Sequence, residues 1–204
     1  MRTSEQIVRK YAKLYRTALK KQGISITGEK TRSYSARLRE MYASDQYRVH
    51  NVYPTVNTPL VYAVIAMCLE LRGDGFSNDK IMGFMNTAFR GKRKFFDTLI
   101  RVINCLPNSF EIARKWNIND HAKREEDHSI TYDYFHVSDD AVEYRISRCM
   151  YVEMFETYGI RELCRIFCET DTRSYAGLRR QVVFVRHSDL SNGDACMDEI
   201  YRRR

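Results

Sequence analysis

The sequence predicts an α+β protein, in which an N-terminal helical layer packs on a small antiparallel sheet with two further helices. Two observations lead to this class. Up to about residue 128, apolar side chains recur every three or four positions, which is the spacing of an amphipathic helix. Between residues 130 and 147 they alternate with polar side chains around a turn at Asp139-Asp140, as in a hairpin of half-buried strands.

Several helices are expected in the first 128 residues. The capping-box pattern Thr3-x-x-Gln6 precedes a basic amphipathic helix, which a glycine-bounded segment at 23–28 ends. This helix suits a protein surface, and a membrane-surface anchor is the alternative. Further helices are expected over residues 35–49, over the apolar segment 60–71, from Ser77 as N-cap to about residue 102, and around Trp116.

The part that begins at residue 129 is expected to hold the sheet and the two further helices. Helices are predicted over residues 149–158 and 161–169, and Gly159 ends the first of them. Two more strands, residues 181–186 and 195–201, flank a turn at residues 191–194. Because no linker composition separates the helical part (1–128) from the α/β part (129–204), one compact domain is expected.

Charge is unevenly distributed along the chain. Residues 1–128 carry 23 Lys+Arg against 13 Asp+Glu, a net charge of +10, whereas residues 129–204 carry 11 against 13, a net charge of −2. The N-terminal part could therefore steer anions or nucleic acid, and the C-terminal part could not do so on charge alone.

The sequence favours a cytoplasmic protein. The N-terminus lacks the apolar segment of a secretory signal, and Pro54, Asn57 and Pro59 interrupt the charge-free run at 49–69, so it is not expected to span a membrane. Without export, the six cysteines are expected to be reduced thiols. Cys68, Cys105 and Cys164 are interpreted as packing residues.

Groups suited to acid, base or nucleophilic chemistry concentrate after residue 148. Cys149 opens a predicted helix, where the helix dipole would lower the pKa of the thiol and favour the thiolate. Glu153 follows one turn later on the same face. Cys168 and Asp171 stand at the end of the next predicted helix.

The two C-terminal strands supply four more candidates. Arg186 and His187 end one predicted strand, on which neighbouring side chains point to opposite faces. Cys196 and Asp198 are two residues apart on the last strand and so share a face.

Metal binding is an alternative role for several of these side chains. Cys149, Cys168 and Cys196 with His187 could form a thiolate site, but no CxxC or HxxxH spacing supports zinc. The histidines at 121, 128 and 136 straddle the change from helix to strand and are expected at the surface. No metal and no cofactor is therefore expected.

The order of these residues resembles the L-2-amino-thiazoline-4-carboxylic acid hydrolase family. In that family a Cys opens a helix ended by a Gly, and C-x-x-D, R-x-x-T-L, a later G and C-D-F follow. The likeness covers about 140 of the 204 residues and is strongest over 144–198. The segment 60–89 is similar to the family's helical half. The matching residues are Arg148-Cys149-x-x-x-Glu153, Gly159, Leu163, Cys168-Glu169-x-Asp171, Arg186, Gly193 and Cys196.

The sequence departs from the family pattern at two places. Asp189 stands where the family has the Thr, and Cys196-Met197-Asp198 stands where the family has C-D-F. The resemblance therefore implies the fold more directly than the substrate. It implies a hydrolase that opens a cyclic amidine or related heterocycle at a non-peptide C–N or C–S bond, giving a carbamoyl-cysteine in the named activity.

Roles for the candidate residues follow from that reaction. Cys149 or Cys168 could attack the electrophilic carbon as a thiolate, or a carboxylate could activate water. Asp171 would hold the protonated amidine, Arg186 the substrate carboxylate, and His187 would transfer a proton to the leaving atom. Glu153, Cys196 and Asp198 would complete the substrate-binding site.

Two alternatives stay open. One is a small-ligand-binding or regulatory domain that keeps the fold without catalysis, which the departures at 189 and 197–198 favour. The other is nucleic-acid binding through the basic runs at 90–94 and 202–204, which lack interleaved aromatic residues and are therefore poorly suited to it. A small-molecule substrate is the expected partner, and a homo-oligomer is an open alternative.

Overall fold

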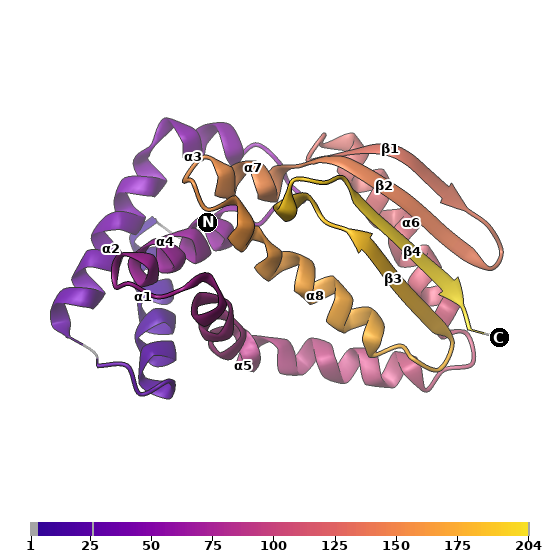
Figure 1. The fold of residues 1–204 in the computed structure, drawn as a ribbon, viewed down its shortest axis with the longest axis horizontal. Coiled ribbons are helices and arrows are strands. Elements are labelled where there is room, and N and C mark those ends of the chain that lie inside the picture. Colours follow the sequence, from indigo (N-terminus) through magenta and orange to yellow (C-terminus); the bar gives the residue numbers. More distant parts are fainter. Residues whose placement is uncertain (1–3, 26, 204) are drawn as a thin grey trace. The chain divides into compact units, whose positions relative to one another are not determined.

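The computed structural model describes residues 4–25 and 27–203, apart from the side chains of residues 90–95. It consists of two compact units, Met1–Gly91 and Lys92–Arg204, and the long helix α5 (Asn78–Asn104) begins in the first and ends in the second (Figure 1). The predicted α+β class is confirmed. Helices occupy the chain as far as Glu126 and the first strand begins at Ile130, whereas the two units divide earlier, inside α5.

In its described residues, the first unit contains helices and no strand. They are α1 (Ser4–Lys21), α2 (Gly28–Ala43), α3 (Asp45–His50), α4 (Thr58–Gly73) and the first part of α5. Every residue from Val61 to Cys68 on α4 is buried, and a helix that is apolar all round needs neighbours on all sides. Both α1 and α2 pack against it.

Helix caps explain where the first unit departs from the prediction. The helix expected over residues 35–49 is in fact two helices, because the Ser44 hydroxyl accepts a hydrogen bond from the Tyr47 N–H and so starts α3. The apolar helix begins as expected: the Asn57 side chain accepts from the Leu60 N–H at 3.3 Å, and Pro59 occupies the first turn.

The second unit is built on a four-stranded antiparallel sheet in the order β1-β2-β4-β3. Besides the end of α5, its elements are α6 (Ser109–Glu126), β1 (Ile130–Val137), β2 (Ala141–Cys149), α7 (Met150–Glu156), the 3₁₀ turn η1 (Arg161–Cys164), α8 (Arg165–Ala176), β3 (Val182–Ser188), the 3₁₀ turn η2 (Leu190–Asn192) and β4 (Cys196–Arg202). The predicted hairpin and the two C-terminal strands are therefore confirmed.

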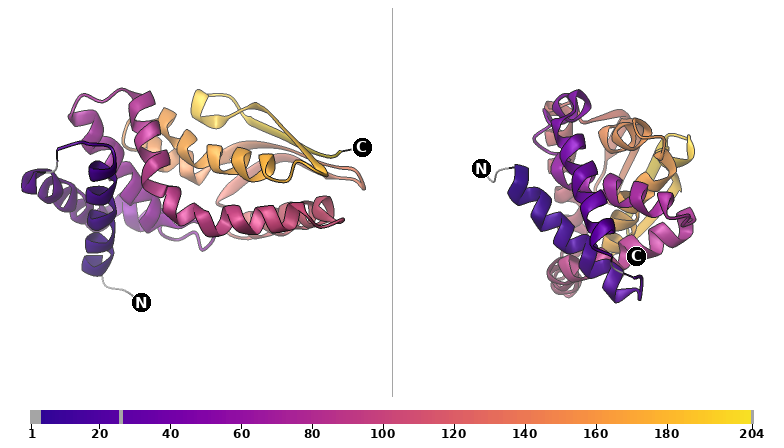
Figure 2. Two further views of the ribbon diagram at one scale, coloured as in Figure 1. Left: turned by 90° about the horizontal axis from the view of Figure 1, so that it is seen from below. Right: turned by 90° about the vertical axis from the view of Figure 1, so that its left-hand side faces the viewer.

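One face of this sheet carries the core. Apolar side chains from the strands meet Ile100, Ile103, Phe110 and Ala113 of the α5 and α6 helices, and Leu178 follows α8 into the same cluster. Figure 2 shows α8 beside the second half of α5. The opposite face carries polar pairs, such as Arg145 with Asp133 at 3.2 Å. This division of faces is the usual consequence of strand alternation.

A helix was predicted over residues 161–169, and its predicted C-terminal boundary was wrong. A 3₁₀ turn covers Arg161–Cys164, and α8 then runs on to Ala176, where Gly177 takes the C-cap. Cys168 and Asp171 consequently lie within a helix and not at its end. They are three residues apart on one helical face, so both can reach the same space.

Gly177 permits the close approach of α8 and α5. A Cβ at this position would lie 2.4 Å from Ile100 Cγ2 and 3.1 Å from the Ser174 carbonyl oxygen. We expect Gly177→Ala to lower the free energy of unfolding of the second unit by about 1–3 kcal/mol, because the added methyl overpacks this contact. Urea denaturation followed by circular dichroism measures it. Gly73→Ala, where an added Cβ meets no atom within 4 Å, is the control and should cause no comparable loss.

Candidate active site

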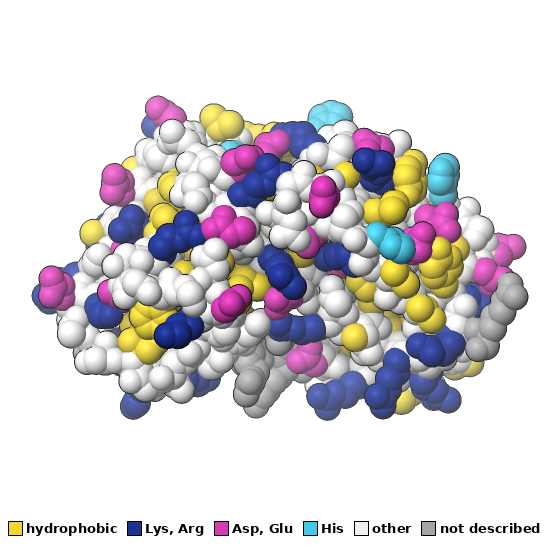
Figure 3. All heavy atoms as spheres, viewed as in Figure 1, with side chains coloured by type: hydrophobic (Ala, Val, Ile, Leu, Met, Phe, Trp, Pro, Cys, Tyr) yellow, Lys and Arg dark blue, Asp and Glu magenta, His cyan; other side chains and the backbone are white. Residues whose placement is uncertain are grey.

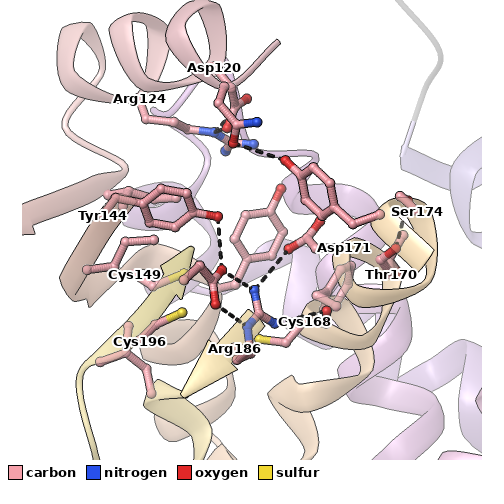
Figure 4. A pocket seen from close by; sticks show the side chains of 18 of the residues that line it. Asp120, Arg124, Tyr144, Cys149, Cys168, Thr170, Asp171, Ser174, Arg186 and Cys196 are labelled. Carbon is pink, nitrogen blue, oxygen red and sulfur yellow. Dashed lines mark hydrogen bonds and ion pairs between the residues drawn. The ribbon is translucent and has the colours of Figure 1, made fainter. Parts of the chain in front are cut away.

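A cavity of about 560 Å³ lies within the second unit, bounded by α6, α8 and the inward face of the sheet (Figure 4). Its walls are mainly aromatic and apolar. Its polar groups come from three places: the middle of α8, the centre of the sheet, and one face of α6. A large, mostly apolar cavity with few converging polar groups is the usual form of a small-molecule site.

The register of the strands brings together the side chains at the centre of the site. Asp198 on β4 lies directly opposite Tyr144 on β2 and Arg186 on β3. The Tyr144 hydroxyl donates to Asp198 Oδ2 at 2.9 Å, and Arg186 donates to both Asp198 oxygens at 2.7 and 2.6 Å. Only 1% of the Asp198 side chain is exposed. Asp198 therefore anchors Arg186 and is too enclosed to contact a substrate.

Each nitrogen of the Arg186 guanidinium is engaged by the protein. Besides its two bonds to Asp198, its Nη1 donates to the Cys168 carbonyl at 3.0 Å, and its Nη2 lies 3.8 Å from Asp171 Oδ2. The expectation that Arg186 grips a substrate carboxylate with two parallel hydrogen bonds is therefore not supported, because its donors already serve Asp198 and α8. It instead links the sheet to the helix that carries Asp171.

Asp171 is the accessible carboxylate that α8 brings to the cavity. It points toward Arg186 from α8, as Figure 4 shows, and 61% of its side-chain surface is exposed. The surrounding cavity walls nevertheless desolvate it and raise the pKa of its carboxyl to about 6, with Arg186 opposing and Asp198 adding to the rise. Asp171 thus combines access to a ligand with a pKa just below neutrality.

The three candidate cysteines line this one cavity. Burial raises the pKa of each thiol, that of Cys168 to about 12. The prediction that the helix dipole lowers the pKa of Cys149 is wrong: Cys149 does cap α7, and the N–H groups of Tyr151 and Val152 favour the thiolate, but desolvation outweighs them. All three are therefore neutral thiols near pH 7.

The wall opposite α8 carries a charged pair that the sequence analysis missed. Asp120 and Arg124 lie one turn apart on α6 with 3.3 Å between Asp120 Oδ1 and Arg124 Nε. Arg124 also lies 5.8 Å from the centre of the Tyr151 ring, and 15% of its side chain is exposed. The i, i+4 spacing of these two charges could have predicted the pair. It was missed because the helix expected around Trp116 was too short to include both residues.

Two predicted site residues lie outside the cavity. Glu153 does not line it and instead pairs with Arg148 at 2.6 Å. His187 points to the other side of β3, where its Nε2 lies 2.8 Å from Glu199 Oε2, and it lines a second, polar pocket of about 470 Å³. Strand alternation separates His187 from Arg186, so His187 cannot deliver a proton to a ligand beside Asp171.

The alternatives weighed from the sequence find little support in the described residues. No group of three or more His, Cys, Asp or Glu residues within that part of the chain could hold a metal ion. Arg202 is engaged by Glu111, by Asp140 at 2.8 Å and by the Phe110 ring. The side chains of the basic run at 90–94 lie outside the described residues. Basic side chains gather at the edge of the second unit where α5 ends and α8 joins β3 (Figure 3).

The remaining cysteines divide by exposure. Cys68 and Cys164 are buried, as expected of packing residues, whereas Cys105 is exposed and that interpretation was wrong. It follows the last turn of α5, where no neighbour covers it as a core position would.

We expect Cys105 to be alkylated first at pH 7. Cys168 should react at least about a hundredfold more slowly than an unhindered thiol, because its raised pKa leaves little thiolate. Peptide mapping by mass spectrometry after brief alkylation measures the order. Labelling of Cys149 or Cys168 ahead of Cys105 would restore the thiolate as the candidate nucleophile.

The fold and the cavity define an α+β protein with a partly open, mostly apolar cavity beside its sheet. The family model described as L-2-amino-thiazoline-4-carboxylic acid hydrolase matches residues 62–199, and the chain belongs to this family. The match includes every cavity residue named above. No curated protein and no solved structure gives a match. None of the helices in the described part of the chain combines the length and apolar character needed to cross a bilayer.

Proposed function

We propose that this protein hydrolyses a small heterocyclic amidine of the 2-aminothiazoline-4-carboxylate type, with Asp171 activating the attacking water. The observation that carries the proposal is the placement of Asp171: an accessible carboxylate, its pKa raised to about 6, that lies beside Arg186 in a largely apolar cavity. A general base works best when its pKa lies near the working pH.

The charge balance of the cavity supports a cationic substrate group. Its charged lining residues are three carboxylates, Asp120, Asp171 and Asp198, and two guanidinium groups, Arg124 and Arg186. The net charge of −1 favours a protonated amidine over a neutral one. Protonation also makes the amidine carbon more electrophilic, so the same environment that binds the group prepares it for attack.

The proposed reaction begins with proton transfer from water to the Asp171 carboxylate. The hydroxide oxygen forms a bond to C2 of the ring, and the C2–N π electrons move onto nitrogen to give a tetrahedral intermediate. Its collapse forms a C=O bond, as the hydroxyl proton passes to solvent, and breaks the C2–S bond, whose electron pair leaves with sulfur. Protonated Asp171 then returns its proton to the sulfur, giving N-carbamoyl-cysteine and a carboxylate ready for another turnover.

Activated water fits this cavity better than a cysteine nucleophile. The thiols of Cys149, Cys168 and Cys196 have raised pKa values, so each would have to be deprotonated against desolvation before it could attack. Asp171 is ionised above about pH 6 and can accept a proton from water without prior deprotonation of a thiol. The cysteines then serve as compact, weakly polar walls around the ring sulfur.

Arg124 is the proposed partner of the substrate carboxylate. It lies on the wall facing α8 and already pairs with Asp120 at 3.3 Å, so the substrate carboxylate would join an existing ion pair; Arg186 is held by Asp198 and the Cys168 carbonyl. Arg124 and Asp171 would thus hold the two oppositely charged ends of a zwitterionic ring. Because guanidinium pairs well with carboxylates, this arrangement would fix which face of C2 meets the water.

The experiment incubates the purified chain with L-2-amino-thiazoline-4-carboxylic acid and identifies the product by NMR. A free thiol marks C–S cleavage, and a free α-amine marks cleavage of the ring C–N bond. Asp133→Asn, on the opposite face of the sheet, is the matched control for Asp171→Asn and should retain activity. Binding without turnover would contradict the proposal and favour the non-catalytic ligand-binding domain.

A further inference from the structure

The cavity is larger than the substrate that the family's name implies. L-2-Amino-thiazoline-4-carboxylic acid has about nine non-hydrogen atoms, and even at about 30 Å³ each, the volume of a water molecule in the liquid, they fill less than about 270 Å³. The cavity measures about 560 Å³, a size typical of sites for larger organic ligands. About half of it would therefore remain unfilled by that ring.

The cavity lining includes a partly exposed aromatic side chain, Trp116, which we call the aromatic end of the cavity. Trp116 on α6 lines the cavity and stacks on Phe96 with 6.0 Å between ring centres, yet 37% of its surface stays exposed. Leu178 lines the same cavity. A large aromatic surface left open inside a cavity gains free energy when a ligand covers it.

One hydrogen bond links the helix that carries this aromatic end to the turn of α8 that follows Asp171. On α8, Tyr175 follows Asp171 by one helical turn, a rise of about 6 Å. The Tyr175 hydroxyl donates to Asn117 Oδ1 at 3.0 Å, and Asn117 is the neighbour of Trp116 on α6. A substituent about one aromatic ring in length could therefore extend from a heterocycle at Asp171 to the exposed surface of Trp116.

We propose that the substrate carries an aromatic substituent on its heterocyclic amidine and that this substituent packs against Trp116. The inference rests on the proposed function, because it assigns the heterocycle to Asp171. It makes Trp116 a specificity-determining residue: its ring selects substituted amidines over the parent ring without taking part in bond making or breaking.

The test compares the parent acid with two analogues that carry a phenyl group, one on the exocyclic nitrogen and one on the ring carbon next to sulfur. At least one analogue is expected to have kcat/KM about 10- to 100-fold above that of the parent. Trp116→Ala should bring this ratio close to one, and Trp116→Phe should restore most of it. Ile118→Ala, two residues along α6 and outside the cavity lining, is the control and should leave the ratio unchanged.

Binding can be followed without turnover, because Trp116 is the only tryptophan of the chain. In the unmodified protein, rapid mixing with either phenyl analogue should alter tryptophan emission, excited where tyrosine does not absorb, before product forms. If the parent is hydrolysed but neither analogue is favoured or alters the emission, the aromatic subsite is refuted and the proposed function stands. If an analogue alters the emission but no compound is hydrolysed, the subsite stands and the proposed function is refuted.

Discussion

Asp171→Asn is expected to lower kcat/KM for the aminothiazoline acid by about 10²- to 10⁴-fold, the range that a positioned general base contributes. The amide keeps the size and shape of the side chain but cannot accept a proton from water near neutral pH. Steady-state kinetics with product detection measures the loss.

The same substitution should leave the fold intact. Asp171 is 61% exposed on its side chain, and its contact with Arg186 spans 3.8 Å, so little packing depends on it. Unchanged circular dichroism, together with normal activity of Asp133→Asn, separates loss of the base from loss of structure. Turnover of Asp171→Asn within about threefold of the unmodified protein would remove Asp171 from the chemistry.

Asp198→Ala is expected to have the largest effect on stability, lowering the free energy of unfolding of the second unit by about 3–5 kcal/mol. The Asp198 side chain is 1% exposed and neutralises the positive charge of Arg186, whose side chain is 15% exposed. Removing the carboxylate leaves a desolvated guanidinium without its main counterion and the buried Tyr144 hydroxyl without its acceptor. Denaturation followed by Trp116 emission reports on this unit.

The adjacent residue provides a matched control for Asp198. Glu199 pairs with His187 on the other face of β4, where 42% of the His187 side chain is exposed. Glu199→Ala should lower the free energy of unfolding by less than about 1 kcal/mol, because exposed ion pairs contribute little to stability. Equal effects at 198 and 199 would show that the Arg186–Asp198 pair does not hold the sheet together.

Much of the fold was predictable because it follows from local periodicity. The alternation from Ile130 onward predicted the hairpin, and the Cys196-x-Asp198 spacing correctly placed both side chains on one face of β4. The ends of elements were less predictable. Ser44 splits one expected helix, and α8 continues to Ala176, seven residues beyond its expected end.

The candidate site was only partly predictable because its properties arise from tertiary contacts. Residue type and spacing singled out Cys149, Cys168, Asp171 and Cys196, and the structure brings these four to one cavity. Burial, which no local pattern specifies, reversed the expected pKa shift of Cys149.

Which side chains pair with one another could likewise not be predicted from the sequence. Arg186 is paired with Asp198 through the register of β3 and β4, and this pairing removes it from substrate binding. Arg124 reaches the cavity because α6 crosses the sheet, so its side chain meets groups more than forty residues away in sequence.

The pH dependence of kcat/KM tests the central claim most directly. Asp171 must be ionised to accept a proton, so activity should be full above its pKa of about 6 and fall about tenfold per pH unit below it. Asp171→Asn should abolish this acidic limb. A thiolate mechanism would instead give activity that keeps rising through pH 8 and 9, because burial raises the pKa values of the cavity thiols. An acidic limb near pH 6 is the result we predict, and a rise that follows thiol ionisation would contradict it.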